Sequence, residues 1–146
     1  MKIYTSYFAQ LRNFPSNLVG LSTAVWEPKW LQPGKDKNGA LWLPIPPLKP
    51  GKSCDGLCNG KCNPKHPQDC TFLKEYRKQL DQIDFEDFLR QLLELRDKIC
   101  AGEYLEDIDF ALLVYEKYDN PCSERVVIQQ WFKDHGIEIE EWHPNV

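Results

Sequence analysis

Four cysteines and one histidine lie close together in the middle of the chain, and this grouping is typical of a metal site. Cys54, Cys58, Cys62, His66 and Cys70 fall within seventeen residues and are separated mainly by glycine, asparagine and proline. This stretch contains one leucine as its only large aliphatic residue, so hydrophobic burial cannot offset the entropy of ordering it. Metal–thiolate bonds would supply that free energy. The sequence therefore predicts a metal ion here, most simply zinc.

Two ligand sets fit this segment. In one set the four cysteines bind the metal, and in the other His66 replaces Cys70. We favour the four-cysteine set, because Cys70 would tie an insertion at about residues 51–70 to the helix that follows it. Four thiolates also suit an iron–sulfur cluster, whereas disulfides would need an oxidising compartment. A closed four-ligand site has no open position, which predicts a structural role.

A second group of reactive side chains follows an apolar run near the C-terminal end. Glu116, Asn120, Cys122, Ser123 and Arg125 lie in one loop and in the first turn of the helix expected after it. A helix dipole and Arg125 would both favour the thiolate of Cys122. In the simpler interpretation Asn120 only caps the helix, Cys122 packs, and Arg125 pairs with a nearby glutamate.

The elements that position this second group form one unit. The apolar run Phe110–Tyr115 is continuous, as in a strand buried on both faces. Asn120 is a suitable N-cap and Pro121 a suitable first helical residue, so we expect a helix from there to Gly136. From Ile137 onward isoleucine alternates with glutamate, which predicts another strand.

The rest of the chain supplies further strands and two more helices. A capping-box pattern opens the second of these helices. Because the two helices connect the third strand to the fourth, they indicate a long crossover within a parallel sheet. We expect one α/β domain over residues 1–146, with four or five mainly parallel strands. The expected strands are Lys2–Tyr7, Leu18–Ser22 and Ala40–Ile45, and the helices run over Pro67–Leu80 and from Asp84 to just before Gly102.

In such sheets ligands bind at the carboxyl ends of the strands. Helix N–H groups and Arg125 favour negative charge, and aromatic rings can stack on a base, so we expect a small anionic or nucleotide-like ligand. The alternative is an enzyme with Cys122 as nucleophile and Glu116 as proton carrier. The predicted ligand site comprises Ser6, Tyr7, Ser22, Thr23, Glu116, Asn120, Cys122, Ser123 and Arg125.

Composition narrows the class of protein. The chain has 146 residues and a net charge of −4, with no clustered lysine and arginine, which argues against binding to a nucleic-acid backbone. No apolar run approaches the ~20 residues of a membrane span. The N-terminal residues lack the apolar core of a signal peptide. We therefore expect a cytosolic protein, a setting in which cysteine clusters bind metal more often than they form disulfides.

The order of these elements resembles a known family. The chain looks like the bacterial and phage proteins of domain of unknown function 488, and the cysteine-rich segment looks like an insertion typical of a subgroup. The resemblance covers nearly the whole chain apart from that insertion and implies an α/β fold with a site at Glu116 and Cys122. The segments that carry it are Ile3–Tyr7, Leu18–Ser22, Ile45–Leu48, the helix containing Tyr76, and Leu112–Cys122.

This chain departs from the family pattern at three places. Where the family ends its second strand with an Asp-Val-Arg-like triplet, the chain has Gly20-Leu21-Ser22. Where the family has Cys-x-Glu, the chain has Val114-Tyr115-Glu116. At the next helix Cys122-Ser123-Glu124-Arg125 stands for Cys-His-Arg, so the arginine is displaced by one position and the histidine is absent. The enzymatic alternative would belong to nucleotide or nucleic-acid metabolism.

Overall fold

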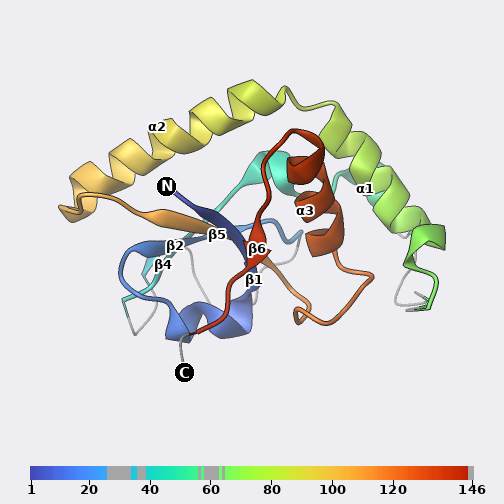
Figure 1. The fold of residues 1–146 in the computed structure, drawn as a ribbon, viewed down its shortest axis with the longest axis horizontal. Coiled ribbons are helices and arrows are strands. Elements are labelled where there is room, and N and C mark those ends of the chain that lie inside the picture. Colours follow the sequence, from blue (N-terminus) through green and yellow to red (C-terminus); the bar gives the residue numbers. More distant parts are fainter. Residues whose placement is uncertain (26–33, 36–38, 56, 58–62, 64, 145–146) are drawn as a thin grey trace.

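The structure is a computed structural model that describes residues 1–25, 34–35, 39–55, 57, 63 and 65–144 (Figure 1). Its strands are β1 (Ile3–Tyr7), β2 (Leu18–Ser22), β3 (Gly34–Lys35), β4 (Leu41–Pro44), β5 (Asp109–Val114) and β6 (Glu140–Glu141). Its helices are α1 (Thr71–Asp81), α2 (Phe85–Glu103) and α3 (Glu124–Asp134). Short 3-10 turns are η1 (Phe8–Asn13), η2 (Pro46–Leu48), η3 (Lys52–Cys54) and η4 (Pro67–Asp69). No helix in these ranges is long and apolar enough to cross a membrane.

The strands form one six-stranded sheet in the order β3-β4-β2-β5-β1-β6. Every neighbouring pair is parallel except β3 and β4. The predicted α/β class and mainly parallel sheet are confirmed. The prediction of four or five strands is too low, because the sheet also contains the two-residue strand β3, which is too short to leave a periodic pattern in the sequence.

β5 lies at the centre of the sheet between β1 and β2. Its residues Phe110 to Val114 are at most 1% exposed, which confirms a strand buried on both faces. On one face Phe110 and Leu112 pack with the three α-helices, whereas Leu113 packs on the other face against Trp42 and Phe8.

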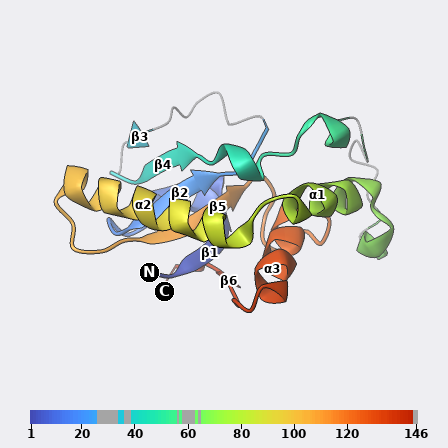
Figure 2. The same ribbon diagram turned by 90° about the horizontal axis from the view of Figure 1, so that it is seen from above.

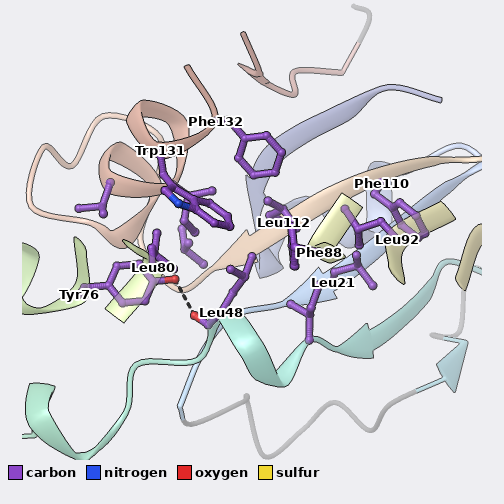
Figure 3. Packing of buried hydrophobic residues seen from close by; sticks show 14 of the residues in the cluster. Leu21, Leu48, Tyr76, Leu80, Phe88, Leu92, Phe110, Leu112, Trp131 and Phe132 are labelled. Carbon is purple, nitrogen blue, oxygen red and sulfur yellow. Dashed lines mark hydrogen bonds between the residues drawn. The ribbon is translucent and has the colours of Figure 1, made fainter. Parts of the chain in front are cut away.

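Two helices, α1 and α2, form the predicted crossover connection between two parallel strands of the sheet. The chain passes from β4 through α1 and α2 to β5, and then through α3 to β6. α1 packs beside α3, while α2 extends along the sheet (Figure 2). Trp131 and Phe132 of α3 and Leu80 of α1 meet the sheet at Leu112 (Figure 3). Tyr76 is fully buried there and donates its hydroxyl to the Leu48 carbonyl at 2.5 Å.

The beginnings of two helices differ from the sequence prediction. α1 begins at Thr71, because Pro67–Asp69 forms the separate turn η4. α3 begins after Ser123, whose hydroxyl accepts the N–H of Arg125 at 3.2 Å. The predicted cap Asn120 instead accepts the N–H of Cys122 at 2.9 Å, which closes a turn before the helix.

The predicted start of α2 is confirmed, and two later boundaries differ. Asp84 caps the helix by accepting the N–H of Asp87 at 3.1 Å. Its end lies past Gly102, where Tyr104 takes the left-handed conformation with φ of 56°. The last strand, β6, pairs only at Glu140–Glu141, because the residues from Ile137 do not yet lie alongside β1.

Candidate functional site

Three parallel strands end at one edge of the sheet, as predicted. Tyr7 of β1 and Ser22 of β2 flank Val114 and Leu113 of β5 in the strand register. The loop from Glu116 to the start of α3 leaves β5 at this edge. The loop residues predicted as a site, from Glu116 to Arg125, therefore lie at the carboxyl ends of the strands.

A pair of carboxyl groups lies at the centre of this edge. The side chains of Glu116 and Glu124 share a hydrogen bond, and the Ser123 hydroxyl donates to Glu116 Oε2 at 3.0 Å. Burial, and then the negative charge of Glu116, raise the pKa of Glu124 from 4.5 to about 7. Because the charge of Glu116 disfavours a second negative charge beside it, Glu124 takes up its proton at a higher pH than an isolated glutamate does. We call Glu116 and Glu124 the carboxyl pair.

Arg125 is directed into the protein. Its side chain is 3% exposed, and its Nε donates to Glu141 Oε1 at 2.6 Å. Its Nη1 and Nη2 donate to the carbonyls of Lys117 and Glu116 at 2.6 and 2.7 Å. The Tyr7 ring lies 5.8 Å from its Cζ, within cation–π range. Arg125 therefore fastens the loop after β5 to β6.

A buried hydrogen-bond chain continues from this arginine. Glu141 Oε1 also accepts from the Thr5 hydroxyl at 2.7 Å, and that hydroxyl accepts from Gln129 Nε2 at 2.7 Å. Burial raises the pKa of Glu141, although Thr5 and Arg125 oppose this effect. The arginine cluster is defined as Thr5, Arg125, Gln129 and Glu141.

Sequence reasoning missed three members of the arginine cluster and the role of Glu124. One signal was present for Glu141, because strand alternation places it on the same face as Ile139. No signal in the sequence pairs Thr5 with Gln129, since 124 positions separate them. The raised pKa of Glu124 likewise depends on Glu116, which the fold brings from the end of β5.

The remaining hydroxyl groups predicted to bind ligand mostly contact backbone. Thr23 is buried and its hydroxyl donates to the Leu113 carbonyl at 2.9 Å. Ser22 accepts the N–H of Ala24 at 3.3 Å. Ser6 is fully buried, and its hydroxyl has no partner among the described residues. Because side chains alternate along β1, Ser6 points to the face opposite Tyr7.

Cys122 is disulfide-bonded in the structure. A thiol in a disulfide cannot act as a nucleophile, so catalysis by this residue would require prior reduction. Cys122 nevertheless lies two residues before Glu124, beside the carboxyl pair.

The structure describes only part of the predicted metal site. Cys54 and Cys70 are 4% and 7% exposed, whereas Cys58 and Cys62 lie outside the described residues. His66 is exposed and its Nδ1 lies 3.5 Å from the amide nitrogen of Gln68. No three His, Cys, Asp or Glu side chains are grouped as metal ligands within the described part of the chain.

The two buried thiols are held at the base of one helix. Cys54 ends η3 and Cys70 is the N-cap of α1, and both η3 and η4 contact α1. Burial raises the pKa of Cys54, with Glu75 adding to the effect. Within the protein alone its neutral thiol is therefore favoured, and a bound cation would be needed to stabilise the thiolate.

Comparison with known proteins yields no match to a protein-family model, a curated protein or a solved structure. The resemblance to domain of unknown function 488 stays a prediction.

Proposed function

We propose that the protein binds a small nucleotide-like ligand at the carboxyl edge of β1, β2 and β5. The observation that carries this proposal is the carboxyl pair, which lies at the end of the central strand and beside the N-terminus of α3. Polar groups that change protonation near pH 7 concentrate at functional sites.

The chemistry of the edge favours the base of such a ligand over its phosphate. The carboxyl pair accepts hydrogen bonds, which suits the amino and ring N–H groups of a nucleobase. Arg125 donates to protein acceptors, and the carboxyl pair repels an anion. Tyr115 and Tyr118, which are 59% and 54% exposed, lie in the same loop and can stack on a flat ring. The nucleobase or nucleoside is therefore the minimal ligand.

A thermal-shift and calorimetry panel tests this proposal. The probes are adenine, guanine, cytosine and uracil, each as base, nucleoside and monophosphate, at pH 6 and pH 8. We expect one base family to bind without its phosphate and to raise the melting temperature by mass action. Glu124→Gln should change the affinity of the protein for this base at least tenfold. Glu138→Gln, which replaces an exposed glutamate just before β6, should leave the affinity unchanged. Absence of any shift across the panel would refute ligand binding of this class.

We further propose that, once the disulfide of Cys122 is reduced, zinc joins the cysteine-rich segment to the domain through Cys54, Cys58, Cys62 and Cys70. The support is the burial of Cys54 and Cys70 beside α1 in a segment with almost no aliphatic side chains. A thiolate set fits Zn²⁺, which would neutralise the charges that burial disfavours. An iron–sulfur cluster is the alternative occupant.

Elemental analysis of protein purified under reducing conditions and without chelator tests the metal. We expect about one zinc per chain. If the analysis finds iron and inorganic sulfide, the occupant is an iron–sulfur cluster instead of zinc. If it finds four free thiols and no metal, the site is refuted. The partly buried Cys100, which is free and far along α2, supplies the control variant Cys100→Ser.

The second candidate is a thiol enzyme that acts after reduction of Cys122. The observation favouring it is Glu124, whose pKa is raised to about 7 and which lies two residues after Cys122. The rate at which reduced Cys122 is alkylated, measured as a function of pH, gives the pKa of its thiol and distinguishes an enzyme from a binding protein. A thiol pKa below ~7 would indicate an activated nucleophile, and a value near ~8.5 would leave binding as the function.

A further inference from the structure

The disulfide of Cys122 joins the loop before α3 to the cysteine-rich segment at residues 51–70. The sequence contains six cysteines, which are Cys100, Cys122 and the four between residues 54 and 70. Cys122 is disulfide-bonded, whereas Cys100 is a free thiol on α2. The sulfur bound to Cys122 therefore belongs to one of the four cysteines that we propose as zinc ligands.

The packing of α1 brings this segment close to the start of α3. Cys70 is the N-cap of α1, and η3, which ends at Cys54, contacts the same helix. α1 in turn packs beside α3. Burial, and then the charges of Glu124 and Cys54, raise the pKa of Tyr76 on α1, so both groups lie within electrostatic range of one buried phenol. The segment and the loop that carries Cys122 are therefore neighbours in the fold.

The loop that carries Cys122 is held by hydrogen bonds of its own. The Cys122 N–H donates to Asn120 Oδ1 at 2.9 Å, and the Ser123 hydroxyl donates to Glu116 Oε2 at 3.0 Å. Arg125 Nη2 donates to the Glu116 carbonyl at 2.7 Å. Because none of these bonds involves a sulfur atom, we expect the start of α3 to keep its place when the disulfide is reduced.

The cysteine-rich segment, in contrast, depends on a cross-link. It contains one leucine as its only large aliphatic residue, so hydrophobic burial cannot hold it. Either a metal bound by thiolates or a disulfide can supply the missing restraint. A four-cysteine zinc site needs every thiolate of the segment, whereas the disulfide takes one of them away. The two cross-links therefore exclude each other.

We propose, on the basis of the zinc site inferred for this segment, that zinc binding and the Cys122 disulfide are two alternative states controlled by oxidation. In the reduced state, zinc fastens the segment to the base of α1 through Cys54 and Cys70. In the oxidised state, the disulfide fastens the segment to the start of α3, and zinc is released. Cys122 lies two residues before Glu124, so the exchange also changes the chain next to the carboxyl pair.

A low-molecular-weight disulfide such as oxidised glutathione can supply the oxidising equivalents. The Cys122 thiolate attacks one of its sulfurs, which forms a mixed disulfide and releases the first glutathione thiolate. A thiolate of the segment then leaves zinc and attacks the Cys122 sulfur, which forms the protein disulfide and releases the second. The two cysteine sulfurs together lose two electrons, and oxidised glutathione gains them. The first glutathione thiolate takes the proton of Cys122, the second takes one from water, and zinc loses one of its four ligands.

Zinc release during oxidation tests the proposal. Protein purified under reducing conditions is freed of reductant and treated with one equivalent of oxidised glutathione in the presence of a zinc-binding dye. We expect release of about one zinc per chain, together with a disulfide at Cys122 in peptide mass mapping. Cys122→Ser should bind the same zinc when reduced but release it at least tenfold more slowly, because the attacking thiol is absent. Cys100→Ser should release zinc at the wild-type rate.

The possible outcomes separate this exchange from the zinc site itself. If reduced wild-type protein holds no zinc, the zinc site is refuted and the exchange with it. If zinc is present but Cys122→Ser releases it as fast as the wild type, only the exchange is overturned. If reduced Cys122→Ser lacks zinc, Cys122 is itself a metal ligand, which also overturns the exchange. Treatment of oxidised wild-type protein with a dithiol and zinc should restore the zinc content, and failure to do so would count against reversible control.

Discussion

The arginine cluster and the cysteine-rich segment at residues 51–70 both bury groups that water would otherwise solvate, but they do so in different ways. In the arginine cluster, hydrogen bonds of 2.6–2.7 Å join Arg125 to Glu141 and to two carbonyls, and Thr5 and Gln129 extend the chain. Only Glu141 Oε2 lacks a partner among the described residues of this cluster. Nearly every donor and acceptor needed is supplied by the chain itself.

The cysteine-rich segment instead buries thiols, which are much weaker hydrogen-bonding groups than a guanidinium. Cys54 and Cys70 are buried at short turns, and burial works against ionisation of Cys54. The difference teaches that a buried arginine can be satisfied by nearby backbone carbonyls, whereas clustered thiols gain most from an ion that the chain does not encode. The first region should therefore be stable alone, and the second should depend on metal.

Breaking the arginine cluster should have the largest effect. Arg125→Met removes the cation and leaves Glu141 and two carbonyls buried without their donor. We expect the free energy of unfolding to fall by ~3–5 kcal/mol, as for other broken buried ion pairs. Urea denaturation measures it. The exposed Arg90→Met should change stability by less than ~0.5 kcal/mol, and an equally small effect of Arg125→Met would show that the cluster does not stabilise the fold.

Removing a buried thiol should affect the cysteine-rich segment more locally. Cys70→Ser places a hydroxyl in an apolar site, which destabilises by ~1–3 kcal/mol, and should abolish stoichiometric zinc. Hydrogen exchange should rise at the turns flanking residues 51–70 while β1, β2 and β5 stay protected. Cys100→Ser should keep both zinc and protection. Zinc retained by Cys70→Ser would favour the set in which His66 replaces this cysteine.

The carboxyl pair predicts a dependence of stability on pH that extends to neutral pH. Because the folded pKa of Glu124 is raised from 4.5 to about 7, it contributes stability below pH 4.5 that is lost as pH rises to about 7. Glu124→Gln keeps the uncharged state at all pH values. At pH 8 this variant should be ~1–2 kcal/mol more stable than wild type, after a discount for partial exposure and for coupling to Glu116.

At pH 4 the wild-type protein and Glu124→Gln should have equal stability, because both carry a neutral side chain. Chemical denaturation at pH 4, 6 and 8 measures the difference, with the exposed Glu138→Gln as control. A difference that does not grow between pH 4 and pH 8 would contradict the raised pKa.

Loss of the α3 cap should have the smallest effect. Ser123→Ala removes the acceptor for the Arg125 N–H and the donor to Glu116, and should lower the free energy of unfolding by ~1 kcal/mol. Asp84→Ala removes the corresponding cap of α2, which has no carboxyl pair beside it. Thermal unfolding should show similar losses. Only Ser123→Ala should alter ligand affinity, and equal affinity in both variants would separate the cap from the binding site.

Much of the fold could be predicted from residue pattern alone. The run Phe110–Tyr115 indicated the central strand, Leu18–Ser22 matched β2 at both ends, and Asp84 indicated the start of α2. These elements follow from apolar periodicity and capping, which depend on residues a few positions apart. The common edge of Tyr7, Ser22 and the loop after β5 then followed from a parallel sheet.

Tertiary structure alone decided how the side chains at that edge are used. Arg125 was predicted to face a ligand, yet its donors meet Glu141 and the loop carbonyls. Local pattern offers Glu124 only as one of the glutamates near Arg125, yet burial and the charge of Glu116 raise its pKa to about 7. Both outcomes depend on contacts between β5, α3 and β6, whose distances are set by packing of the whole sheet. The physical reason is that local patterns determine which element a residue occupies, whereas its pKa and its partners depend on the charges and the solvent that folding brings to it or removes.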